Sequence, residues 1–268
     1  MTLPLYWIDA FARRPFTGNP AGVVPLERWL PDDLMQCIAF ENGFAETAFF
    51  VRTGPGRFQL RWFTPAVEVD LCGHATLASA YVLFHLLGET GAENVVTFDS
   101  KSGPLAVTRR ADGKLELDFP ATPVTPEPDA GVARAVAAAL GQEPVWLGRS
   151  RFDRFAVLAD AAAVRAAQPD LAQVAAAGGR GLIVTARGDG TCDFVSRFFA
   201  PQSGIAEDPA TGSAHCALAP YWADQLARPR LHARQISARG AELWCEVAGE
   251  RVRIAGEAVL YLRGEIAV

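Results

Sequence analysis

The chain has 268 residues, half of them hydrophobic and 21% charged, which is the composition of a folded globular protein with an ample core. A net charge of −5 without any run of Lys or Arg excludes a nucleic-acid surface. The first residues show no signal-peptide pattern, no apolar stretch approaches the ~18 residues of a membrane span, and the five cysteines form no CxxC, so we expect a reduced, cytoplasmic protein without a membrane segment.

The N-terminal half is predicted to combine short strands with two helices. A turn-rich loop, FTGNPAG, follows the first strand, and GPG is the turn of a hairpin. A proline opens the first helix, whose first turn carries two acids. The predicted strands are 5–10, 47–52, 57–63, 94–98, 105–109 and 114–118, and the predicted helices are 31–40 and 74–87.

The proline-rich segment 120–131 is predicted to be a linker between two domains. The N-terminal lobe then covers 1–119 and the C-terminal lobe covers 120–268, with the last strand, about 256–268, packing back onto the first lobe. We expect Pro220 to kink or end the last helix early. The predicted helices of this half are 132–140, 161–177 and one from Thr211, and the predicted strands are 181–185, 192–199, 243–247, 251–255 and 258–263.

One segment occurs twice in the chain. RWFTPAVEVDLCGHATLASAYVLF, from Arg61 to Phe84, matches RFFAPQSGIAEDPATGSAHCALAPYW, from Arg197 to Trp222. Each copy has an Arg, an aromatic pair, a Pro, an acidic stretch and a Gly-polar-Ala step that opens an uncharged helical run. Such a repeat predicts two similar halves, related by a pseudo-twofold, that share one cleft.

The two uncharged helices define the expected fold. A helix that is apolar all round must be covered on all sides. Several short strands in each half indicate a curled sheet wrapped around one central helix, twice over, and hence an α+β protein of two such lobes. Gly73 and Gly212 open these helices, whose first N–H groups have no intrahelical partner and favour an anion such as a carboxylate.

The chemistry is expected to come from acids and helix ends. The chain has no P-loop, no GxGxxG and no GxSxG, and its four histidines lack metal-site spacing, so neither a cofactor nor a metal is predicted. The remaining candidates are Glu46, His74, Asp208 and Ser213. Glu46 stands among small and apolar neighbours, and desolvation in a dry cleft would raise its pKa, as a proton-shuttling group requires.

Four motifs together carry a family resemblance: FTGNPAGVV, FAETAFF, RWFTPAVEVDLCGHATL and EDPATGSAH. In these the chain resembles the phenazine-biosynthesis isomerase (PhzF-like) family, which has the diaminopimelate epimerase fold. The resemblance implies a cofactor-independent isomerase, usually a homodimer, in which a glutamate matching Glu46 shuttles a proton between carbons of a small cyclic acid. In the best-known case the substrate is trans-2,3-dihydro-3-hydroxyanthranilate. It further implies supporting roles for His74, Asp208 and Ser213 and backbone donors to the substrate at Gly73 and Gly212.

Two alternatives stay open at this point. The epimerases of this fold resemble two-base enzymes with one cysteine in each half. Cys72 stands where the first thiol would be, but the second loop has none and Cys216 lies a full turn into its helix, which disfavours a racemase. The other alternative is a non-catalytic binder of small acidic metabolites. A carboxylate at position 46 favours the enzyme, because an anion binds better without one nearby.

Overall fold

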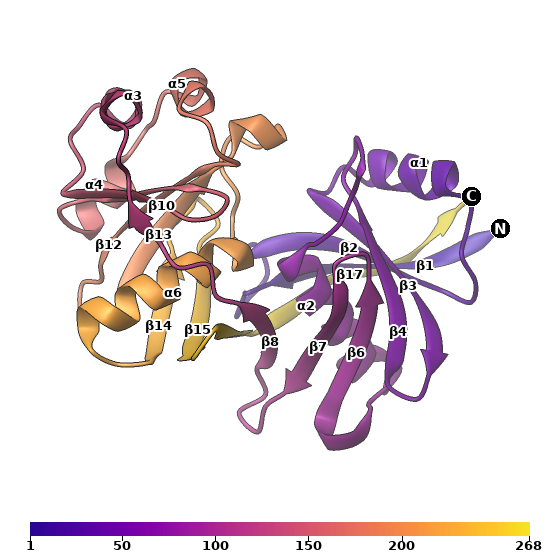
Figure 1. The fold of residues 1–268 in the computed structure, drawn as a ribbon. Coiled ribbons are helices and arrows are strands. Elements are labelled where there is room, and N and C mark those ends of the chain that lie inside the picture. Colours follow the sequence, from indigo (N-terminus) through magenta and orange to yellow (C-terminus); the bar gives the residue numbers. More distant parts are fainter. The chain divides into compact units, whose positions relative to one another are not determined.

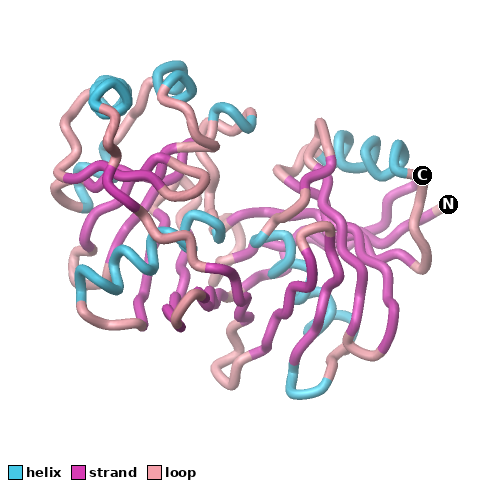
Figure 2. The backbone as a smooth tube through the Cα atoms, in the orientation of Figure 1, coloured by secondary structure: helices cyan, strands magenta, loops and turns pink.

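The computed structural model describes all residues from 1 to 268. The chain forms two compact units: the first contains residues 1–118 and 255–268, and the second contains residues 119–254. The end of the chain therefore returns to the first unit. Figure 1 labels the elements, and Figure 2 distinguishes helices, strands and loops.

The first unit is built on a mostly antiparallel sheet. Its strands pair in the order β17, β1, β2, β3, β4, β6, β7, β8, with β5 also paired to β4. Only the β2–β3 and β4–β6 pairings are parallel. The strand bounds are β1 Thr2–Ala10, β2 Asn19–Leu26, β3 Glu46–Gly54, β4 Arg57–Phe63, β5 Glu68–Val69, β6 Val95–Ser100, β7 Gly103–Arg109, β8 Leu115–Pro120 and β17 Ala258–Ala267.

Helix α2, Gly73–Tyr81, forms the centre of this unit and continues as a π-helical segment, Val82–Leu87. It carries no charged residue, and seven of its nine residues are buried, so its whole circumference is covered. It packs against β1, β2, β3 and β17, and Figure 1 shows it enclosed by the strands. Helix α1, Asp32–Asn42, lies on the outside of the sheet, where Met35 and Ile38 pack in a cluster with Phe49 and Phe63.

The second unit repeats this plan with an additional outer layer of helices. Helix α6, Gly212–Leu226, is largely buried and packs against β14 and β15. Helices α3, α4 and α5 bury their apolar sides in one cluster with β11, β12 and β13. The bounds are β9 Thr125–Pro126, α3 Ala130–Leu140, β10 Trp146–Arg149, β11 Arg154–Val157, α4 Ala161–Ala166, α5 Leu171–Ala176, β12 Leu182–Arg187, β13 Phe194–Phe199, β14 Arg230–Gln235, β15 Ala241–Ala248 and β16 Arg251–Gly256. Short 3-10 turns cover Ala92–Asn94 and Pro201–Ser203.

The sequence repeat corresponds to a repeat in strand pairing. In the first unit, β1–β2–β3–β4–β6–β7 pair as antiparallel, parallel, antiparallel, parallel, antiparallel. In the second, β10–β11–β12–β13–β14–β15 pair in the same succession. In each unit a hairpin, β3–β4 or β12–β13, leads through a loop into the buried helix. Both copies of the motif thus occupy equivalent places.

The prediction that Pro220 ends the last helix early is wrong, because α6 runs on to Leu226, and the kink stays a prediction. Proline has no N–H to donate to the carbonyl one turn before it, which is that of Cys216. That carbonyl instead accepts a hydrogen bond from the Thr122 N–H at 2.9 Å. A donor from outside the helix therefore compensates for the missing one.

The alanine-rich run 161–177 is two short helices rather than the single predicted helix. Pro169 interrupts it, and Asp170 starts α5 by accepting hydrogen bonds from the N–H groups of Ala172 and Gln173.

The sequence prediction also lacks the strands β2, β5, β9, β10, β11 and β14, and it places a loop over 16–22 although β2 already starts at Asn19. Strands β5, β9, β10 and β11 have only two to four residues, which is too short for a period to be recognised. Strand β14 does alternate, with Leu231, Ala233 and Gln235 buried, so its pattern is present in the sequence.

Candidate active site

Glu46 is the first residue of β3, at the end of the sheet where β2 also begins. The two strands are parallel, with Glu46 opposite Ala21, and Asn19 opens β2 two residues earlier. The Glu46 side chain is 14% exposed. The pairing therefore places Glu46 and Asn19 at the same edge of the sheet.

His74 lies in the first turn of α2 and connects these two strands. Its Nε2 is 3.3 Å from Glu46 Oε2, and its Nδ1 is 3.2 Å from Asn19 Nδ2. Burial lowers the pKa of His74 to about 4, so the ring is neutral at pH 7. With the Asn19 amide nitrogen at Nδ1, the ring proton is on Nε2, the atom that faces Glu46. The contact brings a neutral imidazole next to a carboxylate, and it is not an ion pair.

Cys72 is the N-cap residue of α2 and completes the cluster. Its buried Sγ lies 3.5 Å from His74 Nδ1 and 4.0 Å from Nε2. Its carbonyl accepts hydrogen bonds from the N–H and hydroxyl of Thr76, at 3.1 and 2.6 Å. The backbone of Cys72 therefore anchors the helix start while its thiol faces the imidazole.

The loop before α6 holds Asp208 in a fixed position. The Asp208 N–H donates to the carbonyl of Phe198 at 3.0 Å, and the Thr211 hydroxyl donates to the Asp208 carboxylate. Gln235, buried at the end of β14, accepts from the Thr211 N–H at 2.8 Å and donates to the Asp208 carbonyl at 2.6 Å. A single amide side chain thus braces both ends of the segment from 208 to 211.

His215 lies one turn into α6 and is fully buried. Its Nδ1 donates to the Thr211 carbonyl at 2.8 Å, whereas its Nε2 has no hydrogen-bond partner. Burial lowers its pKa to about 4, and the ring is therefore neutral. Burial also raises the pKa of the neighbouring Cys216 thiol to about 12, so that the thiol stays protonated at neutral pH and has no thiolate to accept a proton.

The helices that start at Gly73 and Gly212 lack a side-chain cap. Neither Cys72 nor Thr211, the two N-cap residues, bonds a first-turn N–H through its side chain. The other helices of the second unit do have such a cap, from Asp129, Asp160 and Asp170. The first N–H groups of α2 and α6 are therefore left for another acceptor.

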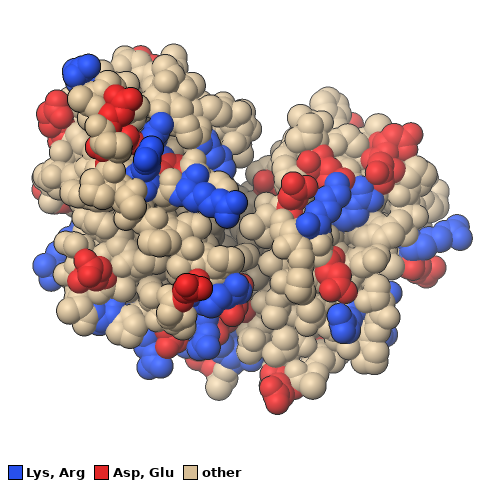
Figure 3. Space-filling model, viewed as in Figure 1, with Lys and Arg blue, Asp and Glu red and all other residues tan.

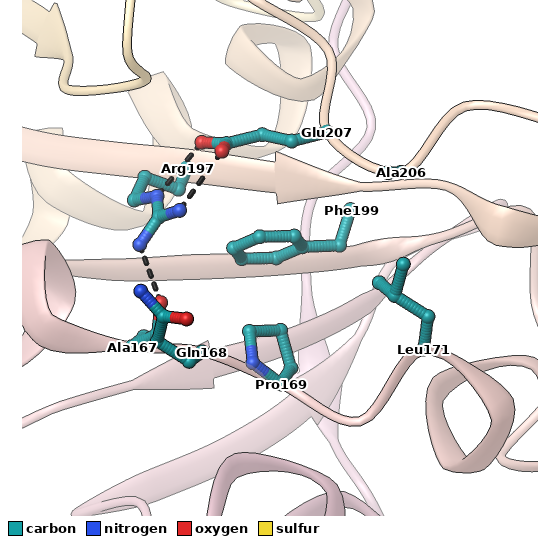
Figure 4. A pocket seen from close by; sticks show the side chains of 8 residues that line it. All are labelled: Ala167, Gln168, Pro169, Leu171, Arg197, Phe199, Ala206 and Glu207. Atoms are coloured by element: carbon teal, nitrogen blue, oxygen red, sulfur yellow. Dashed lines mark hydrogen bonds and ion pairs between the residues drawn. The ribbon is translucent and has the colours of Figure 1, made fainter.

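The arginine that begins each repeat clamps the loop that follows it. Arg61 makes a bidentate pair with Glu68 at 2.7 and 2.9 Å, and Arg197 makes one with Glu207 at 2.7 and 2.8 Å. The guanidinium of Arg197 also donates to the Ala167 carbonyl at 2.5 Å and lies over the Phe199 ring (Figure 4). A cavity of about 230 Å³ is lined by Arg197, Glu207 and Phe199, and by none of the predicted site residues.

The surface carries charges of both signs. On the face drawn in Figure 3, basic and acidic side chains are interspersed among uncharged ones. None of the helices has both the length and the apolar character needed to span a membrane.

The structure brings the predicted residues Glu46 and His74 together in the first unit. Asp208, Gly212 and Ser213 lie together on one loop and helix start of the second unit. Sequence reasoning does not identify Asn19, Thr211 or Gln235. Asn19 has a signal, since it lies in the FTGNPAG motif, whereas Gln235 is missed because its strand is not predicted.

Comparison with known proteins identifies the class. The family model described as "Phenazine biosynthesis-like protein" (PhzC-PhzF) matches residues 8–264. The chain belongs to this family of isomerases, as the four motifs predict. A hydroxyproline epimerase from Agrobacterium vitis, 11% identical with a TM-score of 0.60 over 100% of this chain and 93% of its own, shares the fold alone. The predicted diaminopimelate epimerase-like α+β fold is confirmed.

Two relatives match the chain along its length. A protein of Pseudomonas aeruginosa named as an uncharacterized isomerase is 52% identical over 266 residues, which is 99% of each chain. A crystal structure of a phenazine biosynthesis protein of the PhzF family from Enterococcus faecalis is 47% identical, with a TM-score of 0.94 and 100% of each chain covered. The predicted enzyme class, a PhzF-like isomerase, is confirmed at this level.

Proposed function

We propose that the chain is a cofactor-independent isomerase that moves a proton between carbons of a small cyclic carboxylic or amino acid. Glu46 is the general base that takes the proton and the general acid that returns it. The observation that carries this proposal is the Glu46 carboxylate, which is largely buried and lies with its Oε2 3.3 Å from Nε2 of a neutral imidazole. Family membership supports the reaction class. The proposed substrate is of the type of trans-2,3-dihydro-3-hydroxyanthranilate, which the motif resemblance implies.

The neutral state of His74 suits the role of Glu46, which must both accept a proton and donate it again. An imidazolium would add a positive charge beside Glu46 and oppose protonation of the carboxylate. A neutral ring faces the carboxylate without adding a charge, so the carboxylate can still take up and release a proton. Asn19 keeps the ring in the required tautomer by donating to Nδ1. In this proposal His74 is a catalytic partner that relays a proton or tunes the proton affinity of Glu46, and Asn19 positions the imidazole ring.

The substrate carboxylate is proposed to bind at the uncapped helix ends. Gly73 and Gly212 allow close approach to the first N–H groups, and Ser213 adds a hydroxyl. The absence of a side-chain cap on α6, in a unit whose other helices all have an Asp cap, supports this role. Asp208, braced by Gln235, is proposed to receive a polar group of the substrate or to relay its proton.

We include in the proposal a homodimer, which the family resemblance implies, and a cytoplasmic location, which the cysteine pattern favours. Size-exclusion chromatography with light scattering measures the first, and cell fractionation the second.

The test is carbon-bound proton exchange. Cyclic and α-amino acids are incubated with the enzyme in heavy water, and deuterium incorporation is followed by NMR and mass spectrometry. We expect exchange with a cyclic acid and none with Glu46→Gln. The protein is treated with a strong chelator beforehand, and activity is expected to remain. Loss of activity that one metal restores would contradict cofactor independence, and binding without any exchange would support the non-catalytic alternative.

An amino-acid epimerase remains the second candidate because Cys72 faces the imidazole of His74. A two-thiol mechanism has no second base, however. Thr211 stands before Gly212, and the Cys216 thiol is buried inside α6 with its pKa raised to about 12. Inversion of an α-amino acid in the exchange screen would favour this candidate.

A further inference from the structure

Cys72 lies in a cluster with His74 and Glu46, and the proposed proton transfer does not use its thiol. The ligand-capable atoms of Cys72, His74 and Glu46 all lie within 4.8 Å of one another. They come from the N-cap of α2, the first turn of α2 and the first residue of β3. A thiolate, an imidazole and a carboxylate are the three kinds of ligand that Zn²⁺ takes in proteins.

One of the distances between these atoms already matches that of a tetrahedral site. Ligand bonds of ~2.0 Å to N and O and ~2.3 Å to S place N and O about 3.3 Å apart, and N and S about 3.5 Å apart. His74 Nε2 is 3.3 Å from Glu46 Oε2 and 4.0 Å from Cys72 Sγ. Cys72 Sγ lies nearer to Nδ1, at 3.5 Å, so the Cys72 side chain must turn toward Nε2 before three of the four positions are complete, and water takes the fourth.

The surroundings suit the charges of such a site. Cys72 stands at the N-terminus of α2, whose dipole stabilises a thiolate. Coordination through Nε2 requires the imidazole proton on Nδ1, and Asn19 is already in contact there at 3.2 Å. Turning its amide over presents Oδ1 as the acceptor, which is the usual outer partner of a metal-bound histidine.

We propose that Cys72, His74 and Glu46 form a binding site for Zn²⁺ and related soft divalent cations, and that occupation of this site inhibits the enzyme. As the Zn–S bond forms, the thiol proton leaves to solvent, and the imidazole proton moves to Nδ1. Glu46 then coordinates the metal and is no longer available to take a proton from carbon. The inhibition, but not the binding, rests on the function proposed above.

Binding is tested without substrate. Chelator-treated protein is titrated with Cd²⁺, and the ultraviolet charge-transfer absorption of the cadmium–thiolate bond is recorded. Zn²⁺ affinity is measured by calorimetry. We expect one equivalent of each metal, and Cys72→Ala should lose the absorption band and bind Zn²⁺ at least about 100-fold more weakly, more than the loss of an outer partner costs. Cys37→Ala, which removes the exposed thiol on α1, is the matched control and should keep both.

The outcomes separate the site from the reaction. No band in the wild-type protein, or a band that persists in Cys72→Ala, would overturn the metal site whatever the enzyme does. Zn²⁺ should also stop proton exchange in the wild type, and addition of chelator should restore it. Binding of Zn²⁺ with exchange unaffected would show that Glu46 is not a ligand and would overturn the inhibition.

Discussion

The two units have the same strand pairing but place different chemistry at the start of the buried helix. In the first unit the helix opens with a thiol and an imidazole, next to the Glu46 carboxylate. In the second the equivalent loop carries Asp208 and Thr211, hydrogen-bonded to each other. The shared features are those that set the backbone: an arginine clamp, a glycine and an apolar helix. The comparison indicates that the backbone plan is common, whereas the reactive side chains are specific to each unit.

The histidines show the same division. His74 points to a carboxylate outside its helix, and His215 donates to the Thr211 carbonyl within its own helix. Burial keeps both rings neutral. One histidine therefore serves the proposed reaction, and the other serves the geometry of the loop that holds Asp208.

The largest effect is expected from removal of the first unit's base. Glu46→Gln keeps the shape but cannot accept a proton, so turnover should fall by about 10²–10⁴-fold while ligand affinity stays near normal. Steady-state rates and calorimetry measure the two quantities. Glu41→Gln, an exposed change on α1, is the control. A Glu46→Gln enzyme within a few-fold of the wild type on its true substrate would refute the assignment.

The helix ends test whether the first N–H groups of α2 and of α6 bind an anionic ligand. Valine at Gly73 or Gly212 should block backbone approach and weaken binding by about 10–100-fold, since each lost charge-assisted hydrogen bond costs about 1.5–3 kcal/mol. Circular dichroism checks that the variants fold. Unchanged affinity in both variants would contradict anion binding at these helix ends.

The histidines predict a pH dependence of stability. Their folded pKa of about 4 lies below the ordinary value of 6.5, so the unfolded chain binds more protons between these values. The stabilisation is complete above pH 6.5 and is lost as the pH falls toward 4, on the order of 2 kcal/mol for each histidine between pH 7 and pH 5. Urea unfolding at both pH values measures it. His215→Gln should remove about half of this dependence, and an unchanged slope would show that His215 titrates normally.

A smaller effect is expected from the clamps. Arg197→Lys loses the bidentate contact with Glu207 and should lower the free energy of unfolding by about 1–2 kcal/mol. Arg61→Lys should lower the free energy of unfolding by less. The additional partner of Arg61 is the exposed carboxylate of Asp32, whereas Arg197 also donates to backbone carbonyls. Urea denaturation compares the two. A larger loss for Arg61→Lys would reverse this order.

The sequence predicts the fold and its buried helices better than it predicts the hydrogen bonds that hold the loops in place. The repeat and the uncharged runs after Gly73 and Gly212 predict two buried helices, because a helix without charges must be covered. Glu46 and His74 are predicted through motifs and do meet. Gln235 is not predictable, since its role depends on a parallel pairing between β13 and β14 that no local pattern reveals. Pro220 misleads for the same reason, because the donor that replaces its N–H comes from a distant part of the chain.

The hydrogen bond from Thr122 to the Cys216 carbonyl also makes the stability of α6 depend on the position of the proline-rich segment 120–131. Helix α6 cannot satisfy its own backbone around Pro220, so its middle turns are complete only when the proline-rich segment is in place. Fraying of α6 alone would expose that carbonyl, and release of residue 122 would do the same. The two segments should therefore open as one cooperative unit, and the Thr122 amide should exchange its hydrogen with solvent at the same rate as the amides in the centre of α6.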